Sequence, residues 1–351
     1  MDYQYQNPQQ NNNYYYPQGG SQPPYGYYPP NNSLREKKTE RRRIVIISCA
    51  CGTAILMFLG LSFLLGMGLR GAFPNFDDLL EDTFFYESLN MLSSAVLIFF
   101  PFLFAYLFLK KTKTAGELIF GTPYDRKNFR LLIPITIMIC IIGSFATSYL
   151  SEFVDWAFGV EFIQPDDFSD YNSVGGVMIS LLSTAVIPAF VEEFAIRGVV
   201  MQSLRRYGDW FAIIMSSLVF ALMHGNMIQI PFAFIAGIGI GYAVIKTGTM
   251  WTGIIIHFIN NAIAVISMAA YSNLSENGFT AFSGVLYLAV FAVGAVCLYN
   301  FSKRNARLFT LSKGQCRCLS GSQKTLAFIF TPPMLIAIGI LCYETSLYIM
   351  G

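Results

Sequence analysis

Two glutamates and an arginine interrupt an apolar run near the middle of the chain. The run is AFVEEFAIRGVV, residues 189–200, and its charged members are Glu192, Glu193 and Arg197. Glu193 and Arg197 are four residues apart with the acid first, so on a helix they share a face and can pair. Glu192 is rotated about 100° from that face, which leaves its carboxylate free to act as a base. Pro188, four residues earlier, is expected to kink the helix.

The two histidines of the chain, His224 and His257, also occupy apolar runs. Asn261 follows His257 by four residues and shares its helix face. Gly253 lies on the same face and lets a neighbouring helix approach closely. With a rise of about 1.5 Å per residue, these groups and Glu192 reach overlapping depths of roughly 10–21 Å below one membrane surface. They could therefore line one cavity.

Glutamate, histidine and asparagine side chains in a dry pocket are suited to amide hydrolysis. A desolvated carboxylate is a competent general base for water, and histidine and asparagine donors can hold the developing oxyanion. The alternative is a zinc site, with Glu192, His224 and His257 as ligands and water in the fourth position. The spacing leaves both open. We favour the metal-free arrangement, because His257 and Asn261 point two donors from one helix face.

The elements that must position these residues are membrane helices. The chain is 54% hydrophobic and 13% charged, against about 25% charged for a soluble domain. The apolar residues come in blocks of about bilayer length, at roughly 44–69, 89–109, 131–150, 175–204, 210–224, 228–245, 249–271, 281–301 and 325–350. The predicted fold is all-α, a polytopic transmembrane bundle of about 8–9 spans. No nucleic-acid partner is indicated; the expected surroundings are a lipid bilayer.

The chain divides into four parts: a Tyr/Gln/Asn/Pro-rich tail ending in a basic cluster at 1–43, N-terminal spans at 44–174, spans that carry the candidate catalytic residues at 175–270 and C-terminal spans at 271–351. The tail is predicted to be disordered and cytoplasmic, and such a tail could recruit a cytoplasmic partner. Acidic and basic loops alternate, and Glu87 is counted with the acids of the first acidic loop. Because cytoplasmic loops collect Lys and Arg, we expect a multi-pass cell-membrane protein with 110–130 and 302–324 in the cytoplasm.

Three motifs in this chain resemble those of the CPBP family, the CAAX protease and bacteriocin-processing or Abi family. Glu-Glu-x-x-x-Arg, Phe-x-x-x-His and His-x-x-x-Asn occur in order on three predicted spans, and their residues here are Glu192, Glu193, Arg197, Phe220, His224, His257 and Asn261. The resemblance covers roughly residues 175–270. It implies a helical intramembrane endopeptidase, and members are described both as metalloproteases and as metal-independent glutamate proteases.

Carried over, the resemblance makes Glu192 and His224 the activators of water and His257 and Asn261 the oxyanion donors, with Glu193 and Arg197 in support. The chain has a bacterial character, and bacteria generally lack prenylated CAAX proteins. We therefore expect a membrane-associated peptide or a leader-bearing precursor as substrate, and bacteriocin processing or immunity as the setting. The rival reading is a non-catalytic transporter or proton relay, because a charged cluster in mid-membrane also marks ion pathways.

Overall fold

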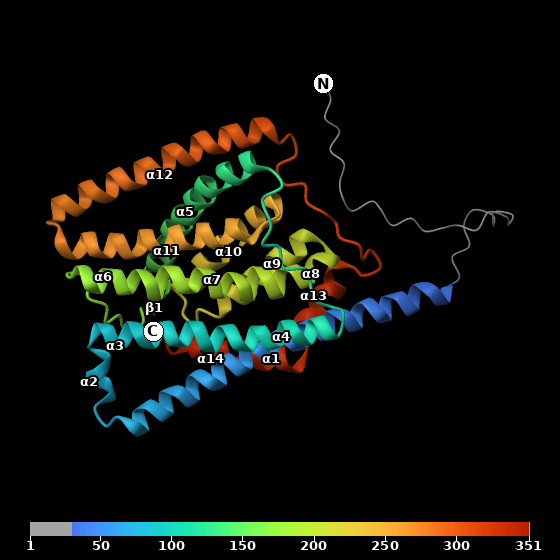
Figure 1. Ribbon diagram of the computed structural model, residues 1–351, viewed down its shortest axis with the longest axis horizontal. Helices are drawn as coiled ribbons and strands as arrows, with labels where there is room; N and C mark the ends of the chain where they lie inside the picture. Colours follow the sequence, from blue (N-terminus) through green and yellow to red (C-terminus); the bar gives the residue numbers. More distant parts are fainter. Residues whose placement is uncertain (1–29, 351) are drawn as a thin grey trace.

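A computed structural model of the protein describes residues 30–350, which form mostly helices packed along one common direction (Figure 1). In chain order the helices are α1 (Pro30–Ala72), α2 (Phe76–Leu80), α3 (Thr83–Leu92), η1 (Ser93–Ile98), α4 (Phe99–Lys111), α5 (Arg126–Phe158), α6 (Val174–Ser180), η2 (Leu181–Val186), α7 (Ile187–Glu193), η3 (Phe194–Met201), α8 (Gln202–Leu204), η4 (Arg205–Tyr207), α9 (Asp209–Leu222), α10 (Gln229–Thr247), α11 (Met250–Asn273), α12 (Glu276–Arg304), α13 (Gly321–Ile329) and α14 (Pro332–Ser346). Strands β1 (Glu161–Phe162) and β2 (Ile349–Met350) pair antiparallel. The predicted all-α fold is confirmed.

Within residues 30–350, seven helical stretches are long and apolar enough to cross a membrane. They are Leu34–Ala72, Thr83–Lys111, Arg126–Phe158, Val174–Tyr207, Gln229–Thr247, Met250–Asn273 and Glu276–Arg304. Helices α13 and α14 together make an eighth span that is bent by 74°. Pro332 and Pro333 open α14 and cannot donate backbone hydrogen bonds to α13, which explains the break. The protein is a multi-pass membrane protein.

Helix α9 is too short to cross the membrane by itself. Its 14 residues extend about 21 Å, less than the roughly 30 Å of the hydrocarbon core. The backbone N–H of Asp209, at its start, donates to Ser312 O at 2.9 Å. At the end of α10, Lys246 Nζ donates to Thr310 O at 3.1 Å. Both ends of the α9–α10 hairpin therefore contact the loop between α12 and α13, and its turn lies deep in the bundle.

This deep turn carries His224. Non-helical backbone at membrane depth needs hydrogen-bond partners within the protein, and Asn226 supplies them. Its Nδ2 atom donates to His224 O at 3.0 Å, and its Oδ1 atom accepts from the N–H of Gln229 at 2.9 Å. Gly225 adopts a positive φ of 66°, a conformation that glycine tolerates best. These hydrogen bonds hold the turn in a defined conformation that presents His224 to the interior of the bundle.

The first helix begins earlier than the apolar block that predicts it. Helix α1 starts at Pro30, so the basic cluster at its N-terminal end is helical rather than part of a tail. Glu40 accounts for this extension, because Arg206 Nη2 donates to its carboxylate at 2.8 Å and the Tyr207 hydroxyl donates to its backbone carbonyl at 3.3 Å. The remainder of the predicted disordered tail lies outside the described residues.

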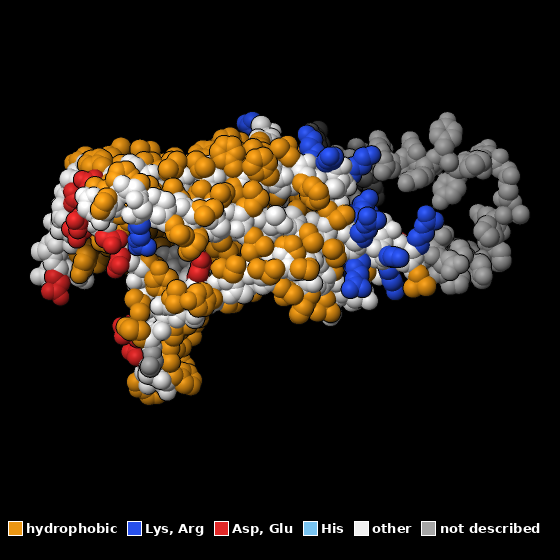
Figure 2. All heavy atoms as spheres, turned by 90° about the horizontal axis from the view of Figure 1, so that it is seen from below, with side chains coloured by type: hydrophobic (Ala, Val, Ile, Leu, Met, Phe, Trp, Pro, Cys, Tyr) orange, Lys and Arg blue, Asp and Glu red, His pale blue; other side chains and the backbone are white. Residues whose placement is uncertain are grey.

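Charge is separated along the length of the bundle. Figure 2 shows Lys and Arg gathered at one end and most Asp and Glu at the other. The first helix enters at the basic end, where Glu40 meets Arg206. The C-terminal strand β2 pairs with β1, which follows the acidic end of α5. The described chain therefore starts and finishes at opposite ends, because α9 and α10 together leave the basic end and return to it. We predict that the basic end faces the cytoplasm.

Cysteine labelling can test this orientation, but the native pair at the basic end is a poor reporter. Cys316 is buried and poorly accessible to a reagent, and burial raises the pKa of the Cys318 thiol to about 11, so little reactive thiolate forms on Cys318. Introduced cysteines at exposed positions serve better. In a Cys342→Ser background, an impermeant maleimide should label Asn172→Cys in intact cells and Arg307→Cys only after permeabilisation. The reverse pattern would invert the topology.

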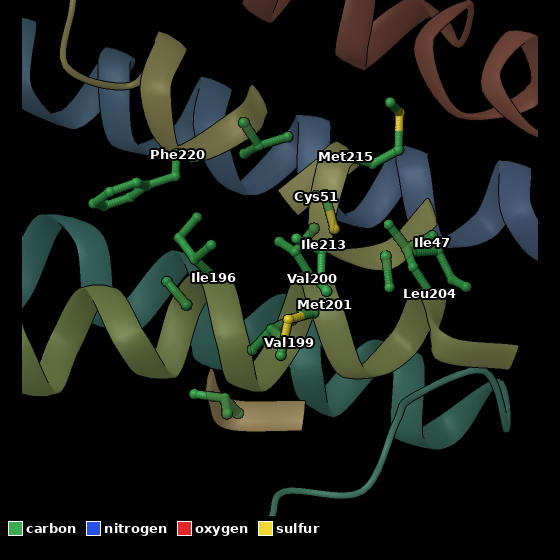
Figure 3. Close-up of a cluster of buried hydrophobic side chains, with 14 of the residues drawn as sticks. Ile47, Cys51, Ile196, Val199, Val200, Met201, Leu204, Ile213, Met215 and Phe220 are labelled. Carbon is green, nitrogen blue, oxygen red and sulfur yellow. The ribbon is translucent and has the colours of Figure 1, made fainter. Parts of the chain in front are cut away.

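The helix that contains the charged run lies at the centre of the bundle. The stretch 174–207 contacts α1, α4, α9, α10 and α11. Apolar side chains from this stretch, α1 and α9 form one buried cluster (Figure 3), which includes Ile47, Cys51, Ile196, Val199, Val200, Met201, Leu204, Ile213, Met215 and Phe220. This packing fixes the position of the helix on several sides, and so fixes the charged residues it carries.

Candidate active site

The helix through residues 174–207 changes its hydrogen-bond pattern around the charged run. The π-helical turns η2 and η3 flank α7, and such turns occur frequently at functional sites. Pro188, in the first turn of α7, has no N–H to donate to the carbonyl of Thr184 four residues earlier. The side-chain amide of Asn261 donates to that carbonyl at 2.8 Å. Because Pro188 cannot donate to it, the Thr184 carbonyl is free to accept from Asn261, and this hydrogen bond connects the helix to α11.

Glu193 and Arg197 form the ion pair that their spacing predicts. Arg197 Nη1 donates to Glu193 Oε1 at 2.6 Å, and the two side chains are 1% and 0% exposed. The arginine also donates to the carbonyl of Gly237 in α10 at 3.4 Å. Its guanidinium carbon lies 4.6 Å from the ring centroid of Phe220, in cation–π geometry. Arg197 therefore links three helices through one buried charge.

His257 completes this network from α11. Its Nδ1 atom lies 3.1 Å from Glu193 Oε1. A β-carbon at Gly253, one turn earlier, would collide with the Glu193 carboxylate and with Val244. The predicted close helix approach at Gly253 is confirmed, and it is what lets His257 reach Glu193.

The direction of this hydrogen bond constrains the imidazole. Paired with Arg197, the Glu193 carboxylate is ionised and can only accept, so His257 Nδ1 carries the hydrogen. The second ring nitrogen, Nε2, lies 3.8 Å from Glu192 Oε2. In the neutral ring this nitrogen is a bare acceptor that could bind a metal. In the imidazolium it is a donor.

Glu192, His224, His257 and Asn261 all line one cavity of about 280 Å³ inside the bundle. Glu192 keeps 21% of its side chain exposed, whereas Glu193 is fully enclosed. The helical spacing predicts that Glu192 is free and that Glu193 is paired, and the exposed fractions of the two side chains agree with this prediction.

His224 presents one nitrogen to this cavity. Its Nδ1 atom lies 2.8 Å from the carbonyl oxygen of Phe220, so Nδ1 donates and Nε2 is left available. The Phe220 ring stacks edge-to-face on both histidines, with centroids 4.8 Å from His224 and 5.9 Å from His257. The aromatic residue of the Phe-x-x-x-His motif thus holds both imidazoles through its backbone and its ring.

Comparison with known proteins gives one match. Residues 175–263 match the family model described as type II CAAX prenyl endopeptidase Rce1-like. This matched segment is called the Rce1-like domain after the family model that it resembles. The predicted family is confirmed over this segment, which spans about a quarter of the 351 residues and contains all six predicted site residues. The searches of curated proteins and of solved structures found no match.

The Rce1-like domain contains side chains of the types that ligate zinc, but the structure does not bring three of them close together. Two imidazoles and a carboxylate are a common catalytic zinc set. Within the described residues, however, no three His, Cys, Asp or Glu side chains are grouped closely enough to hold a metal ion. The predicted alternative of Glu192, His224 and His257 as ligands does not fit this geometry.

Part of the cavity wall comes from outside the Rce1-like domain. Asn90, Ser93 and Ser94, from α3 and η1, line the same cavity as the histidines. They were not predicted, because uncharged polar residues at the edge of an apolar block carry no distinctive spacing. Asn260 adds another amide and donates to Asn261 Oδ1 at 3.0 Å. The cavity therefore offers hydrogen-bonding groups well beyond the motif residues.

Glu87 is a buried acid that the sequence reading placed in a loop. That placement is wrong: Glu87 lies in α3 and is fully buried. Its carboxylate accepts hydrogen bonds from Ser169 at 2.8 Å and from Ser180 and Ser183. Three hydroxyl donors offset the loss of hydration, so an acid at the edge of an apolar block can enter the bundle. Because Ser183 lines the cavity, Glu87 supports the wall of the Rce1-like domain.

A second, smaller cavity adjoins the first. It has a volume of about 70 Å³ and shares Glu192, Phe220 and His224 with the larger one. Its remaining lining is apolar, from Phe58, Ile98, Ala195, Ile196 and Met223. An apolar cavity of about 150 Å³ holds benzene, so this space suits one small apolar side chain beside the carboxylate.

Proposed function

We propose that the protein is an intramembrane endopeptidase that hydrolyses a peptide bond in a membrane-associated peptide or a leader-bearing precursor. The observation that carries the proposal is that Glu192, His224, His257 and Asn261 line a single cavity inside the bundle. The match of residues 175–263 to an endopeptidase family supports the same reaction class.

In the proposed reaction, Glu192 is the general base. Its carboxylate removes a proton from a water molecule that is also hydrogen-bonded to His224 Nε2, and the water oxygen attacks the carbonyl carbon of the peptide bond. The electrons of the C=O double bond move to the oxygen. His257 Nε2–H and the second Nδ2 hydrogen of Asn261 donate to this oxyanion. Collapse then breaks the C–N bond, and protonated Glu192 returns its proton to the leaving amine.

Glu193 and Arg197 are proposed as positioning residues. Glu193 orients the His257 ring through the 3.1 Å contact at Nδ1, which directs Nε2–H of the imidazolium to the oxyanion. Arg197 balances that charge and holds α9 and α10 in place. Neither side chain needs to touch the substrate, and both are almost completely buried.

The walls of the two cavities support a peptide rather than a prenyl chain as the bound group. Asn90, Ser93 and Asn260 can hydrogen-bond to an extended peptide backbone in the larger cavity. The apolar space beside Glu192 is about 70 Å³, which accepts a small side chain and not a long isoprenoid. We therefore propose that the residue beside the cleaved bond carries a small apolar side chain and that prenylation is not required.

The deciding experiment is proteolysis by purified protein. The full chain in a nonionic detergent is incubated with three peptides: a farnesylated CAAX peptide, the same peptide without the farnesyl group, and an apolar leader peptide with alanine or valine at the cleavage position. Mass spectrometry should detect cleavage of the leader peptide that is absent with Glu192→Gln. Cleavage of the farnesylated peptide alone would contradict the proposed substrate. No cleavage of any peptide by folded protein would favour the proton-relay reading.

The role of His257 gives a further prediction. His257→Ala should lower kcat by about 10²–10³-fold, the effect of losing one oxyanion donor, and leave KM within about threefold. Phe258→Ala, its exposed neighbour on α11, is the matched control and should keep near-normal kcat. A metal chelator should leave wild-type activity unchanged. Activity that is lost with chelator and restored by zinc would replace the oxyanion role with metal ligation while keeping the protease assignment.

A further inference from the structure

A second cleft lies at the basic end of the bundle, away from the proposed active site. Its volume is about 220 Å³. Its basic lining comes from three elements: Arg43 on α1, Lys113 after α4, and Arg206 near the end of the helix that carries Glu192, which also contributes Gln202. Lys113 has a positive φ of 56°, an uncommon backbone conformation for a residue other than glycine.

Gln202 lines this cleft and carries a buried side-chain donor without a partner among the described residues. Its side chain is 6% exposed. Its Oε1 atom accepts from Arg205 Nη1 at 3.2 Å, which fixes the orientation of the amide. The Nε2 atom is buried and has no hydrogen-bond partner among the described residues. Buried donors are almost always paired in native proteins, so this atom is a candidate donor to an acceptor on a ligand.

The charges around the cleft favour an anion. Arg43, Lys113 and Arg206 contribute three positive charges to the lining, which contains no acid. Glu40 lies just behind it, 2.8 Å from Arg206 Nη2 and 4.0 Å from Arg43 Nη1. The single negative charge of Glu40 against the three positive charges leaves an excess of two positive charges at the cleft. A phosphate group matches this set, because arginine and lysine supply charge and the glutamine amide supplies a neutral donor.

The same helices continue from the cleft into an apolar groove. Ile47 lines the cleft, and Ala50, Ala54 and Met57 follow it on the same face of α1. Ala50, Ala54 and Met57 border a groove of about 280 Å³ together with Phe104 and Phe108 of α4, and this groove is lined almost wholly by apolar side chains. A charged cleft followed along one helix pair by an apolar groove matches a phospholipid, with its head group in the first and an acyl chain in the second.

We propose that this cleft binds the phosphate of an anionic phospholipid from the leaflet at the basic end of the bundle. Arg43, Lys113 and Arg206 neutralise the head group, and Gln202 Nε2 donates to a phosphate oxygen. The bound lipid connects α1, the segment after α4 and the basic end of the helix that carries Glu192. It therefore stabilises the folded protein over its lipid-free form.

Thermal unfolding of the purified full chain tests the proposal without relying on proteolysis. In a nonionic detergent, phosphatidylglycerol should raise Tm by about 5 °C, whereas phosphatidylcholine and inorganic phosphate at the same concentration should not. An equal rise with inorganic phosphate would overturn the lipid assignment in favour of a soluble phosphate. An equal rise with phosphatidylcholine would overturn the selectivity for anionic lipid.

Variants assign the effect to the cleft. Lys113→Gln and Gln202→Leu should each remove most of the phosphatidylglycerol shift, measured against their own lipid-free Tm. Lys110→Gln is the matched control, because it removes one exposed basic charge three residues away that does not line the cleft, and it should keep the shift. Full shifts in both cleft variants would overturn the proposal. Lys113→Gln alone decides the matter if Gln202→Leu does not fold.

Discussion

Glu192→Gln is expected to reduce proteolysis by about 10²–10⁴-fold, the range for loss of a general base, while the protein stays inserted and folded. The carboxylate lines the cavity beside both histidines and keeps 21% of its side chain exposed. Glutamine keeps the shape but cannot accept a proton. Because Glu192 lies outside the buried Glu193–Arg197 pair, Tm should fall by less than about 3 °C. The measurement is kcat/KM on the leader peptide, with Tm recorded on the same preparation.

Glu276→Gln serves as the control for this prediction. It makes the same chemical change at an exposed position in the first turn of α12, and activity should remain within about twofold of wild type. Near-normal cleavage by Glu192→Gln would remove Glu192 from the mechanism, whatever the folded state of the variant. A Tm drop as large as that of a core substitution would mean that the carboxylate is structural.

The spacing of the motif residues predicts much of the candidate site. Helical periodicity alone separates Glu192 from the Glu193–Arg197 face, and the structure shows one glutamate at the cavity and the other paired at 2.6 Å. Gly253 was predicted to allow close helix approach, and the Glu193 carboxylate occupies the space where its β-carbon would be. These features follow from local geometry within one helix, which a sequence encodes directly.

Features that depend on contacts between distant segments were not predictable in this way. Glu87 looks like a loop acid because the three serines that hold it lie 82–96 residues further along the chain. The basic cluster before residue 44 is helical because Glu40 meets Arg206, 166 residues away. Hydropathy also cannot distinguish a full span from α9, which is apolar but ends short of the far surface. Because α9 ends before it has crossed the membrane, the turn that follows it and carries His224 lies deep in the bundle.

Arg197→Ala is expected to lower the free energy of unfolding by about 3–5 kcal/mol, the range for breaking a buried ion pair. The substitution leaves the Glu193 carboxylate in an enclosed site with His257 as its one remaining hydrogen-bond partner among residues 30–350, and it removes the contacts to Gly237 and Phe220. Activity should be lost together with stability, because His257 then loses its fixed orientation. Chemical denaturation in detergent measures the first effect, and peptide cleavage the second.

A double substitution separates the buried charge from the packing of the arginine. Glu193→Gln combined with Arg197→Met removes both charges, keeps an acceptor for His257 and refills the volume, so part of the lost stability should return. Arg304→Ala is the comparison variant. It breaks an ion pair in which Arg304 Nη2 lies 3.0 Å from Asp125 Oδ2, with the Arg304 side chain 40% exposed and that of Asp125 18% exposed. Its free energy of unfolding should change by about 1 kcal/mol or less. If the double variant is no more stable than Arg197→Ala alone, the unpaired carboxylate is not what destabilises the protein. The arginine would then act mainly through its contacts with Phe220 and α10.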